Sequence, residues 1–252
     1  MNAKACIAMT ALGLVFIAGS AGSAVAAAAD LAAAVADPHR PDADRARDAA
    51  RKPAEVLAFA GVKRGDKVLE LLPGHGYFTR VISVAVGPAG HVYAVAPATN
   101  PENGKPANPN PVAGDPAYGN VTGVAMAFGK LVSAPEPVDL IFTAQNYHDL
   151  HLSRFELDIA ALDKDLYAAL KPGGLLIVED HAAEPGSGLR DPDRLHRIDE
   201  AVVKKEVLSA GFVLEGESDV LRNPADTHTL MVFDPSIRGH TDQFVLKFRK
   251  PR

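Results

Sequence analysis

The stretch KVLELLPGHGYFTR, residues 67–80, decides the fold. It begins with an apolar run that contains one acid, Glu70, and continues through the turn Pro73-Gly74-His75-Gly76 into residues with helical spacing. This order of strand, glycine turn and helix is typical of the start of a βαβ unit. Glycines let the backbone pass close to a ligand, and a helix that begins near Gly76 directs unpaired N–H groups toward it. The sequence therefore predicts a ligand site at this turn.

These residues resemble motif I of the class I S-adenosylmethionine-dependent methyltransferases, whose pattern is acid-x-Gly-x-Gly-x-Gly. Glu70, Gly74 and Gly76 fit the pattern, whereas Leu72 stands where the first glycine usually stands. A glycine turn also suits a dinucleotide-binding protein, so the segments that follow must decide between the two.

Two later segments match the same family. Leu-Lys-Pro-Gly-Gly-x-Leu, at residues 170–176, precedes an apolar run at the expected distance, and Ala-Gly-Phe follows at residues 210–212. The resemblance covers about residues 55–250. Within the superfamily, Asn-Tyr-His-Asp at residues 146–149 and His-Arg-Ile-Asp-Glu at residues 196–200 are similar to an uncharacterised group of predicted exported methyltransferases.

Strand-like and helix-like patterns alternate along the chain. Helices are expected at residues 76–86, 153–170 and 193–210, and strands at residues 67–72, 91–96, 120–127, 138–143, 175–180, 211–214 and 243–250. Such alternation predicts an α/β, Rossmann-like, doubly wound fold with a mostly parallel seven-stranded sheet and an antiparallel last strand. A ligand is then expected at the carboxyl edges of strands one and four.

Three regions follow from the patterns. Residues 1–28 are predicted to be a signal peptide, residues 29–60 an N-terminal helical segment and residues 61–252 the methyltransferase-like domain. Cleavage of the leader predicts a periplasmic or secreted protein with no stable membrane insertion; an uncleaved anchor is the alternative, since residues 5–29 are long enough to span a bilayer. A helix at residues 43–60, which Pro53 can split, either covers the cofactor site or only packs.

Composition excludes several classes of protein. The chain has 26 Lys and Arg against 31 Asp and Glu, a net charge of -5, so no nucleic-acid partner is expected. One cysteine builds neither a disulfide framework nor a cysteine metal site. Cofactor and acceptor chemistry must therefore come from other residue types.

The resemblance implies S-adenosylmethionine as the cofactor. It also implies that the residues around the turn and after strand four hold it: Glu70, Leu72, Pro73, Gly74, His75, Gly76 and Asn146. In the family, an acid near the end of strand two binds the ribose hydroxyls; here Pro97 takes that place. Phe78 is expected to pack under the turn.

Methyl transfer mainly needs alignment and exclusion of water, so no fixed catalytic signature is expected. Four histidines follow the predicted strands, at positions 148, 151, 181 and 196. His148 is predicted as a base for the acceptor, or else it shapes its loop through backbone hydrogen bonds. No metal is predicted, although the histidines at 148, 151 and 181 with Glu179 and Asp180 offer ligand atoms. Residues 196–200 are expected on an exposed helix face, unless Arg197 binds an anionic acceptor.

The sequence thus predicts an S-adenosylmethionine-dependent methyltransferase acting on an unknown small-molecule acceptor. A binding protein that kept the fold and lost the chemistry is the alternative. A dehydrogenase of the NAD type is disfavoured by the Leu-Lys-Pro-Gly-Gly segment and the final antiparallel strand.

Overall fold

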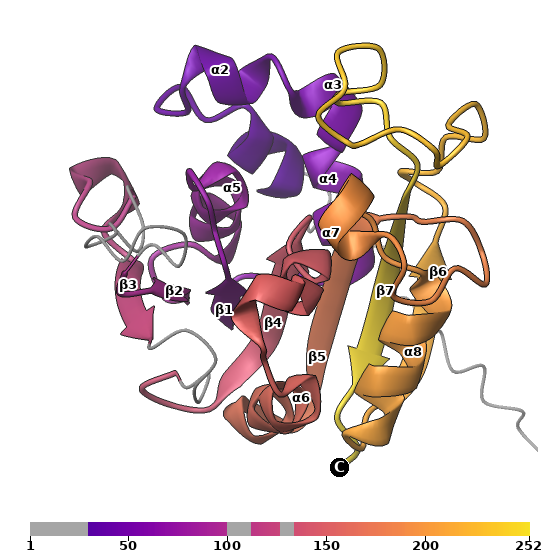
Figure 1. Cartoon of the computed structure of the whole chain (residues 1–252). Coiled ribbons are helices and arrows are strands. Elements are labelled where there is room, and N and C mark those ends of the chain that lie inside the picture. Colours follow the sequence, from indigo (N-terminus) through magenta and orange to yellow (C-terminus); the bar gives the residue numbers. More distant parts are fainter. Residues whose placement is uncertain (1–29, 100–111, 127–133) are drawn as a thin grey trace, which may run out of the picture.

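The computed structural model describes residues 30–99, 112–126 and 134–252, and its elements are labelled in Figure 1. One sheet contains seven strands: β1 Lys67–Leu71, β2 His91–Pro97, β3 Val121–Met126, β4 Val138–Ala144, β5 Leu170–His181, β6 Val213–Ser218 and β7 Gln243–Arg249. Their order is β3-β2-β1-β4-β5-β7-β6. β7 is antiparallel to both neighbours, and the pairs from β3 to β5 are parallel. The predicted fold class is confirmed.

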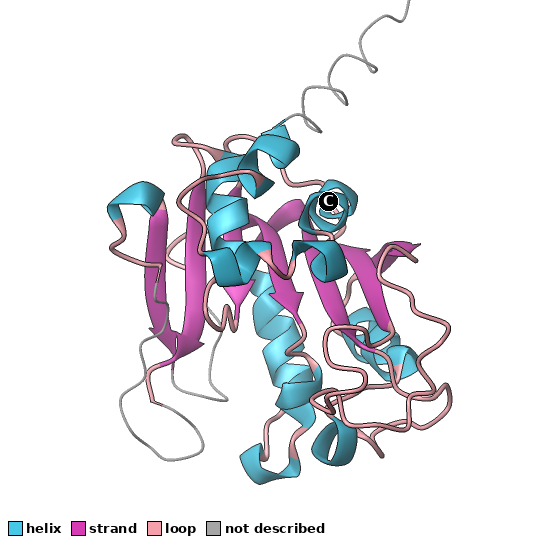
Figure 2. Cartoon of the chain, turned by 90° about the horizontal axis from the view of Figure 1, so that it is seen from above, coloured by secondary structure: helices cyan, strands magenta, loops and turns pink. Residues whose placement is uncertain are grey.

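Alternating side chains of the strands supply two separate cores. In β1, Val68 points to one face and Leu69 to the other; Ile177 and Val178 divide in the same way in β5. The first face is covered by α4 (Pro53–Ala60) and α5 (Tyr77–Val86), the second by α6 (Ile159–Ala169) and α8 (Glu200–Ser209). Figure 2 shows helices on both sides of the sheet. Central strands buried on both faces explain their near-continuous apolar runs.

The helix expected at residues 153–170 begins later than predicted, at Ile159. Two short 3-10 turns, η2 (His148–His151) and η3 (Ser153–Phe155), come first. Glu156, with φ of 48°, breaks the chain direction, and Asp158 then caps α6 by accepting the Ala161 N–H at 2.9 Å. An aspartate cap of this kind fixes where a helix starts.

The helix expected at residues 193–210 is two helices, α7 (Pro192–Leu195) and α8. His196, with φ of 54°, ends α7, and Asp199 caps α8. Between them Arg197 is fully buried; it donates to the Ala182 carbonyl at 2.9 Å and pairs with Asp226 at 2.8 Å. Both predictions for residues 196–200 are therefore wrong, because the segment is not an exposed helix face and Arg197 already has buried partners.

The helix expected at residues 43–60 is split into α2 (Asp42–Arg45), α3 (Asp48–Arg51) and α4. The expected break at Pro53 is confirmed, because Lys52 before it is left-handed with φ of 41°. Asp48 joins this segment to α5: it accepts from the Tyr77 hydroxyl at 2.6 Å and from both terminal nitrogens of the buried Arg40. The segment is thereby held above the start of α5.

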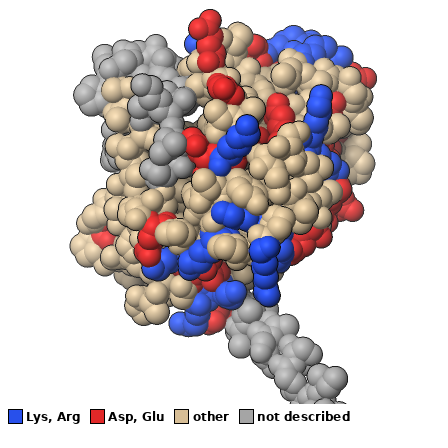
Figure 3. Space-filling model, turned by 90° about the horizontal axis from the view of Figure 1, so that it is seen from below, with Lys and Arg blue, Asp and Glu red and all other residues tan. Residues whose placement is uncertain are grey.

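The predicted signal peptide, residues 1–28, lies outside the described residues, as does most of residues 98–118, a proline-rich stretch that follows β2. Among the helices that the structure describes, none combines the length and apolarity needed to cross a membrane. On the face drawn in Figure 3, basic and acidic side chains lie among each other, with uncharged areas between them.

Candidate functional site

The turn after β1 has three residues in the left-handed region. Leu72, Gly74 and Gly76 have φ of 54°, 57° and 80°, and the Gly76 N–H donates to the Pro73 carbonyl at 2.9 Å. Leu72 thus adopts a conformation that a glycine would reach freely, at a cost of roughly 1–2 kcal/mol. Backbone strain of this kind concentrates at functional sites.

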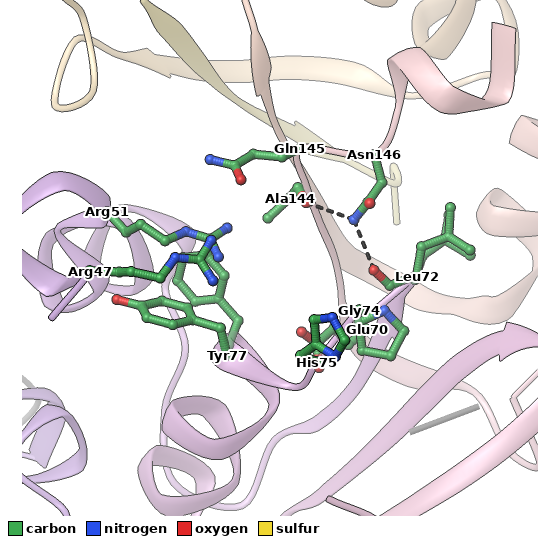
Figure 4. A pocket seen from close by; sticks show the side chains of 13 residues that line it. Arg47, Arg51, Glu70, Leu72, Gly74, His75, Tyr77, Ala144, Gln145 and Asn146 are labelled. Atoms are coloured by element: carbon green, nitrogen blue, oxygen red, sulfur yellow. Dashed lines mark hydrogen bonds between the residues drawn. The ribbon is translucent and has the colours of Figure 1, made fainter. Parts of the chain in front are cut away.

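This turn encloses a hollow of about 180 Å³, called here the glycine-turn hollow. Leu72 lines the hollow and does not fill it. The Asn146 side-chain amide donates to the Leu72 carbonyl at 2.8 Å and to the Ala144 carbonyl at 2.6 Å, which ties the ends of β1 and β4 together (Figure 4). Of the cofactor residues expected from the sequence, the structure brings six to the hollow: Glu70, Leu72, Pro73, Gly74, His75 and Asn146. Gly76 does not line the hollow and instead occupies the N-cap position of α5.

Glu70 lies under the turn and is only 4% exposed. Its carboxylate accepts the Thr79 hydroxyl of α5 at 2.5 Å. Burial raises the pKa of Glu70 to about 8, although the Thr79 hydrogen bond and the charges of Arg51 and Arg80 act in the opposite direction. Glu70 therefore links the end of β1 to the first turn of α5 and so holds the glycine turn between them in place.

Arg47, Arg51 and Gln145 are among the residues in the wall of the hollow that were not predicted. Figure 4 shows both guanidiniums above the ring of Tyr77. The Arg51 guanidinium lies 4.4 Å from the centre of the Tyr77 ring and 4.7 Å from that of Phe78. Phe78 is buried beneath the turn against Phe142, as expected. The arginines bring positive charge to the opening of the hollow.

A larger cavity of about 530 Å³ adjoins the hollow. The two share Arg47, Arg51, His75 and Gln145, and the cavity adds residues from β5 and the chain before β7, among them His181, Phe233 and Arg238. Two adjoining spaces therefore lie at the carboxyl edges of β1, β4 and β5, where a doubly wound sheet binds its ligands.

Glu179 stands fully buried beside this edge. Its carboxylate lies 3.7 Å from a terminal nitrogen of Arg51 and, among the described residues, has no hydrogen-bond donor. Burial raises the pKa of Glu179 to about 7, against the lowering effect of the Arg51 charge. Arg51 is thus the cation that faces this buried carboxylate, and its charge also acts on Glu70.

The structure separates the histidines by environment. His148 is outside the walls of both spaces; its Nδ1 lies 2.7 Å from Asp180 and its Nε2 3.2 Å from Asp149. Burial lowers the pKa of His148, but the two carboxylates outweigh it and raise the pKa to about 10. A place between two carboxylates and outside both spaces does not suit the predicted role as base, which stays a prediction. His181 does line the larger cavity, and burial lowers its pKa to about 3.

Comparisons with known proteins agree with the fold. No family model matches the chain. A protein-L-isoaspartate O-methyltransferase of Ignicoccus hospitalis is 48% identical over 42 residues, which is 17% of this chain and 20% of that relative's length. The structure resembles an S-adenosylmethionine-dependent methyltransferase from Aquifex aeolicus, with a TM-score of 0.51, 19% identity, and coverage of 79% of this chain and 89% of that one. It also resembles the cyclase SpnF, with a TM-score of 0.53, 17% identity, and coverage of 81% and 82%.

The chain therefore has the fold of the class I S-adenosylmethionine-dependent methyltransferases. The same architecture occurs in a protein named for a different reaction, the cyclase. The fold alone consequently does not determine the reaction, which depends on the residues of the site.

Proposed function

We propose that this protein binds S-adenosylmethionine in the glycine-turn hollow and transfers its methyl group to a small molecule in the larger cavity. The observation that carries the proposal is the open hollow between the ends of β1 and β4, which shares four wall residues with a second, larger space. Glycines at 74 and 76 let the backbone approach a ligand, and the start of α5 offers N–H groups to it.

The bound sulfonium supplies an electrophilic methyl group. An acceptor in the larger cavity would take up this methyl group through a lone pair, the electron pair of the broken carbon–sulfur bond would remain on sulfur, and any acceptor proton would pass to solvent. This chain's residues align the reactants and exclude water, the main contributions to such a displacement. Arg47, Arg51 and Arg238 around the cavity favour an acceptor with a negatively charged group.

A second candidate is a binding protein without transferase activity. It is favoured by Pro97 at the end of β2, where the family's ribose-binding acid is expected, and by the strained Leu72. Export would favour it as well, because S-adenosylmethionine is made in the cytoplasm. The two candidates differ first in whether the protein binds that cofactor.

Calorimetric titration of the protein with S-adenosylmethionine and S-adenosylhomocysteine tests the proposal. We expect binding that Glu70→Ala weakens at least tenfold, about 1.4 kcal/mol, because the turn loses the carboxylate that accepts from Thr79. Glu70→Gln is the control, since an amide oxygen can still accept that hydrogen bond. Absence of binding at millimolar cofactor would leave only the binding-protein candidate.

We also propose that the protein is exported, on the basis of its apolar leader. We further propose that it belongs with an uncharacterised group of predicted exported methyltransferases, on the basis of the segments at residues 146–149 and 196–200. Cleavage after the small residues predicts a mature chain that begins within residues 27–30. Fractionation of expressing bacteria followed by N-terminal sequencing checks this. A chain found in the membrane fraction with its leader intact would instead support the anchor.

A further inference from the structure

Three metal-ligating side chains meet beside the larger cavity, outside the residues that line it. His148 and Asp149 belong to η2, and His196 ends α7, which packs against η2. One carboxylate oxygen of Asp149 lies 3.2 Å from Nε2 of His148 and 3.4 Å from Nδ1 of His196. All three ligand atoms lie within 4.8 Å of one another.

We propose that His148, Asp149 and His196 form a site for a divalent metal ion such as Zn²⁺ or Fe²⁺. Two imidazole nitrogens and one carboxylate oxygen are a donor set typical of such metals, with further positions left for water or a ligand. Bonds of 2.0–2.1 Å in a tetrahedral arrangement place neighbouring ligand atoms about 3.4 Å apart. Both measured separations to Asp149 are close to that spacing.

Asp180 supplies the support that metal-bound histidines require. Its fully buried carboxylate lies 2.7 Å from Nδ1 of His148 and accepts the backbone N–H groups of His148 and His181, each at 2.7 Å. Three hydrogen bonds fix this carboxylate, which favours the tautomer of His148 with hydrogen on Nδ1. The other nitrogen, Nε2, is then directed at the cluster as a ligand. A carboxylate that orients a ligating histidine from behind is the usual arrangement at protein metal sites.

The surroundings shield the cluster partly from water. The side chains of His148, Asp149 and His196 are 3%, 34% and 20% exposed, so the group is neither sealed nor free on the surface. The ring centres of Phe233 and His196 are 5.0 Å apart, and those of His181 and His148 are 5.9 Å apart. Both covering residues line the larger cavity, so a bound metal would stand directly behind its wall.

The competing explanation is an ion-paired histidinium with no metal. In that case His148 carries protons on both nitrogens and is held between Asp149 and Asp180, and His196 only adds a weak contact. The two explanations differ in what happens when a metal is offered, and the sequence supplies a matched control. His228 is also left-handed with φ of 61°, is also 20% exposed, and also pairs with an aspartate, Asp242, at 3.0 Å.

The test uses the untagged full chain, treated with a chelator and titrated with Co²⁺, whose visible absorption reports nitrogen and oxygen ligation in place of Zn²⁺. We expect one tight equivalent that Zn²⁺ displaces. His196→Asn should weaken Co²⁺ binding at least about 100-fold, and asparagine tolerates the left-handed backbone there. His228→Asn should leave binding within about twofold of the unmodified chain.

Asp149→Asn is the second variant, in case His196→Asn fails to fold by circular dichroism, and it should also abolish the absorption bands. Absence of Co²⁺ binding below millimolar concentration in the unmodified chain would overturn the proposal in favour of the histidinium. Equal binding by His196→Asn and His228→Asn would overturn it too. The titration contains no S-adenosylmethionine, so its outcome is independent of the proposed transferase activity.

Discussion

Gly76→Ala is expected to weaken S-adenosylmethionine binding at least 100-fold, about 2.7 kcal/mol. A Cβ atom at this position would lie 2.3 Å from a methyl group of Val112, which is fully buried in the core. The backbone φ of 80° adds strain for any residue other than glycine. The turn must therefore move, and with it the carbonyls and N–H groups that shape the glycine-turn hollow. Calorimetric titration measures the loss.

Gly65→Ala is the matched control for the strain alone. Gly65 has nearly the same φ, 82°, but open space where the Cβ would stand, and it lies at the other end of β1. Both variants should lose roughly 1–2 kcal/mol of unfolding free energy from the left-handed backbone. Gly76→Ala should lose a further 1–3 kcal/mol, approximately, from overpacking. Cofactor binding by Gly76→Ala equal to that by Gly65→Ala would show that the turn does not form the cofactor site.

The sheet could be predicted because its signals are local. Val68 and Leu69 alternate between two covered faces, and the run that contains them reads as a buried parallel strand from the sequence alone. The helix ends were predicted less well. His196 and Glu156 stop helical segments by adopting positive φ, and neither residue type signals this as glycine or proline does.

The site was predictable in part for a similar reason. Glu70 and the glycines share one short stretch with a recognisable order, whereas Arg51 reaches the hollow from a helix that precedes the first strand. Its position depends on the left-handed Lys52 and on Arg40 and Asp48, which hold the segment against Tyr77. Contacts so distant in sequence leave no periodic pattern. Leu72 shows the opposite case: the sequence revealed the departure, and only the structure showed that leucine keeps the glycine-like backbone.

Arg51→Met is expected to lower the free energy of unfolding by about 3 kcal/mol at about pH 8.5, but by only about 1 kcal/mol at about pH 5.5. The arginine faces the fully buried Glu179 and also acts on Glu70. At high pH, the variant must either ionise these carboxylates without their cation or bind protons to keep them neutral, and both cost free energy. At low pH both are protonated, so mainly the stacking of the guanidinium on Tyr77 and Phe78 is lost. Urea denaturation at the two pH values measures the difference.

The sign follows from the direction of the pKa shifts. Burial raises the pKa of Glu179 from 4.5 to about 7, so its favourable contribution is complete below pH 4.5 and is lost as the pH rises through 7. Arg51 limits that loss because its charge lowers the same pKa. Without Arg51 the pKa of Glu179 rises further, so the unfolding free energy continues to fall up to a higher pH. Arg51→Lys keeps a cation, so its loss of unfolding free energy should depend less on pH. Adding Glu179→Gln to Arg51→Met should recover part of the stability at about pH 8.5. Equal losses at both pH values would mean that Arg51 acts through packing and not through its charge.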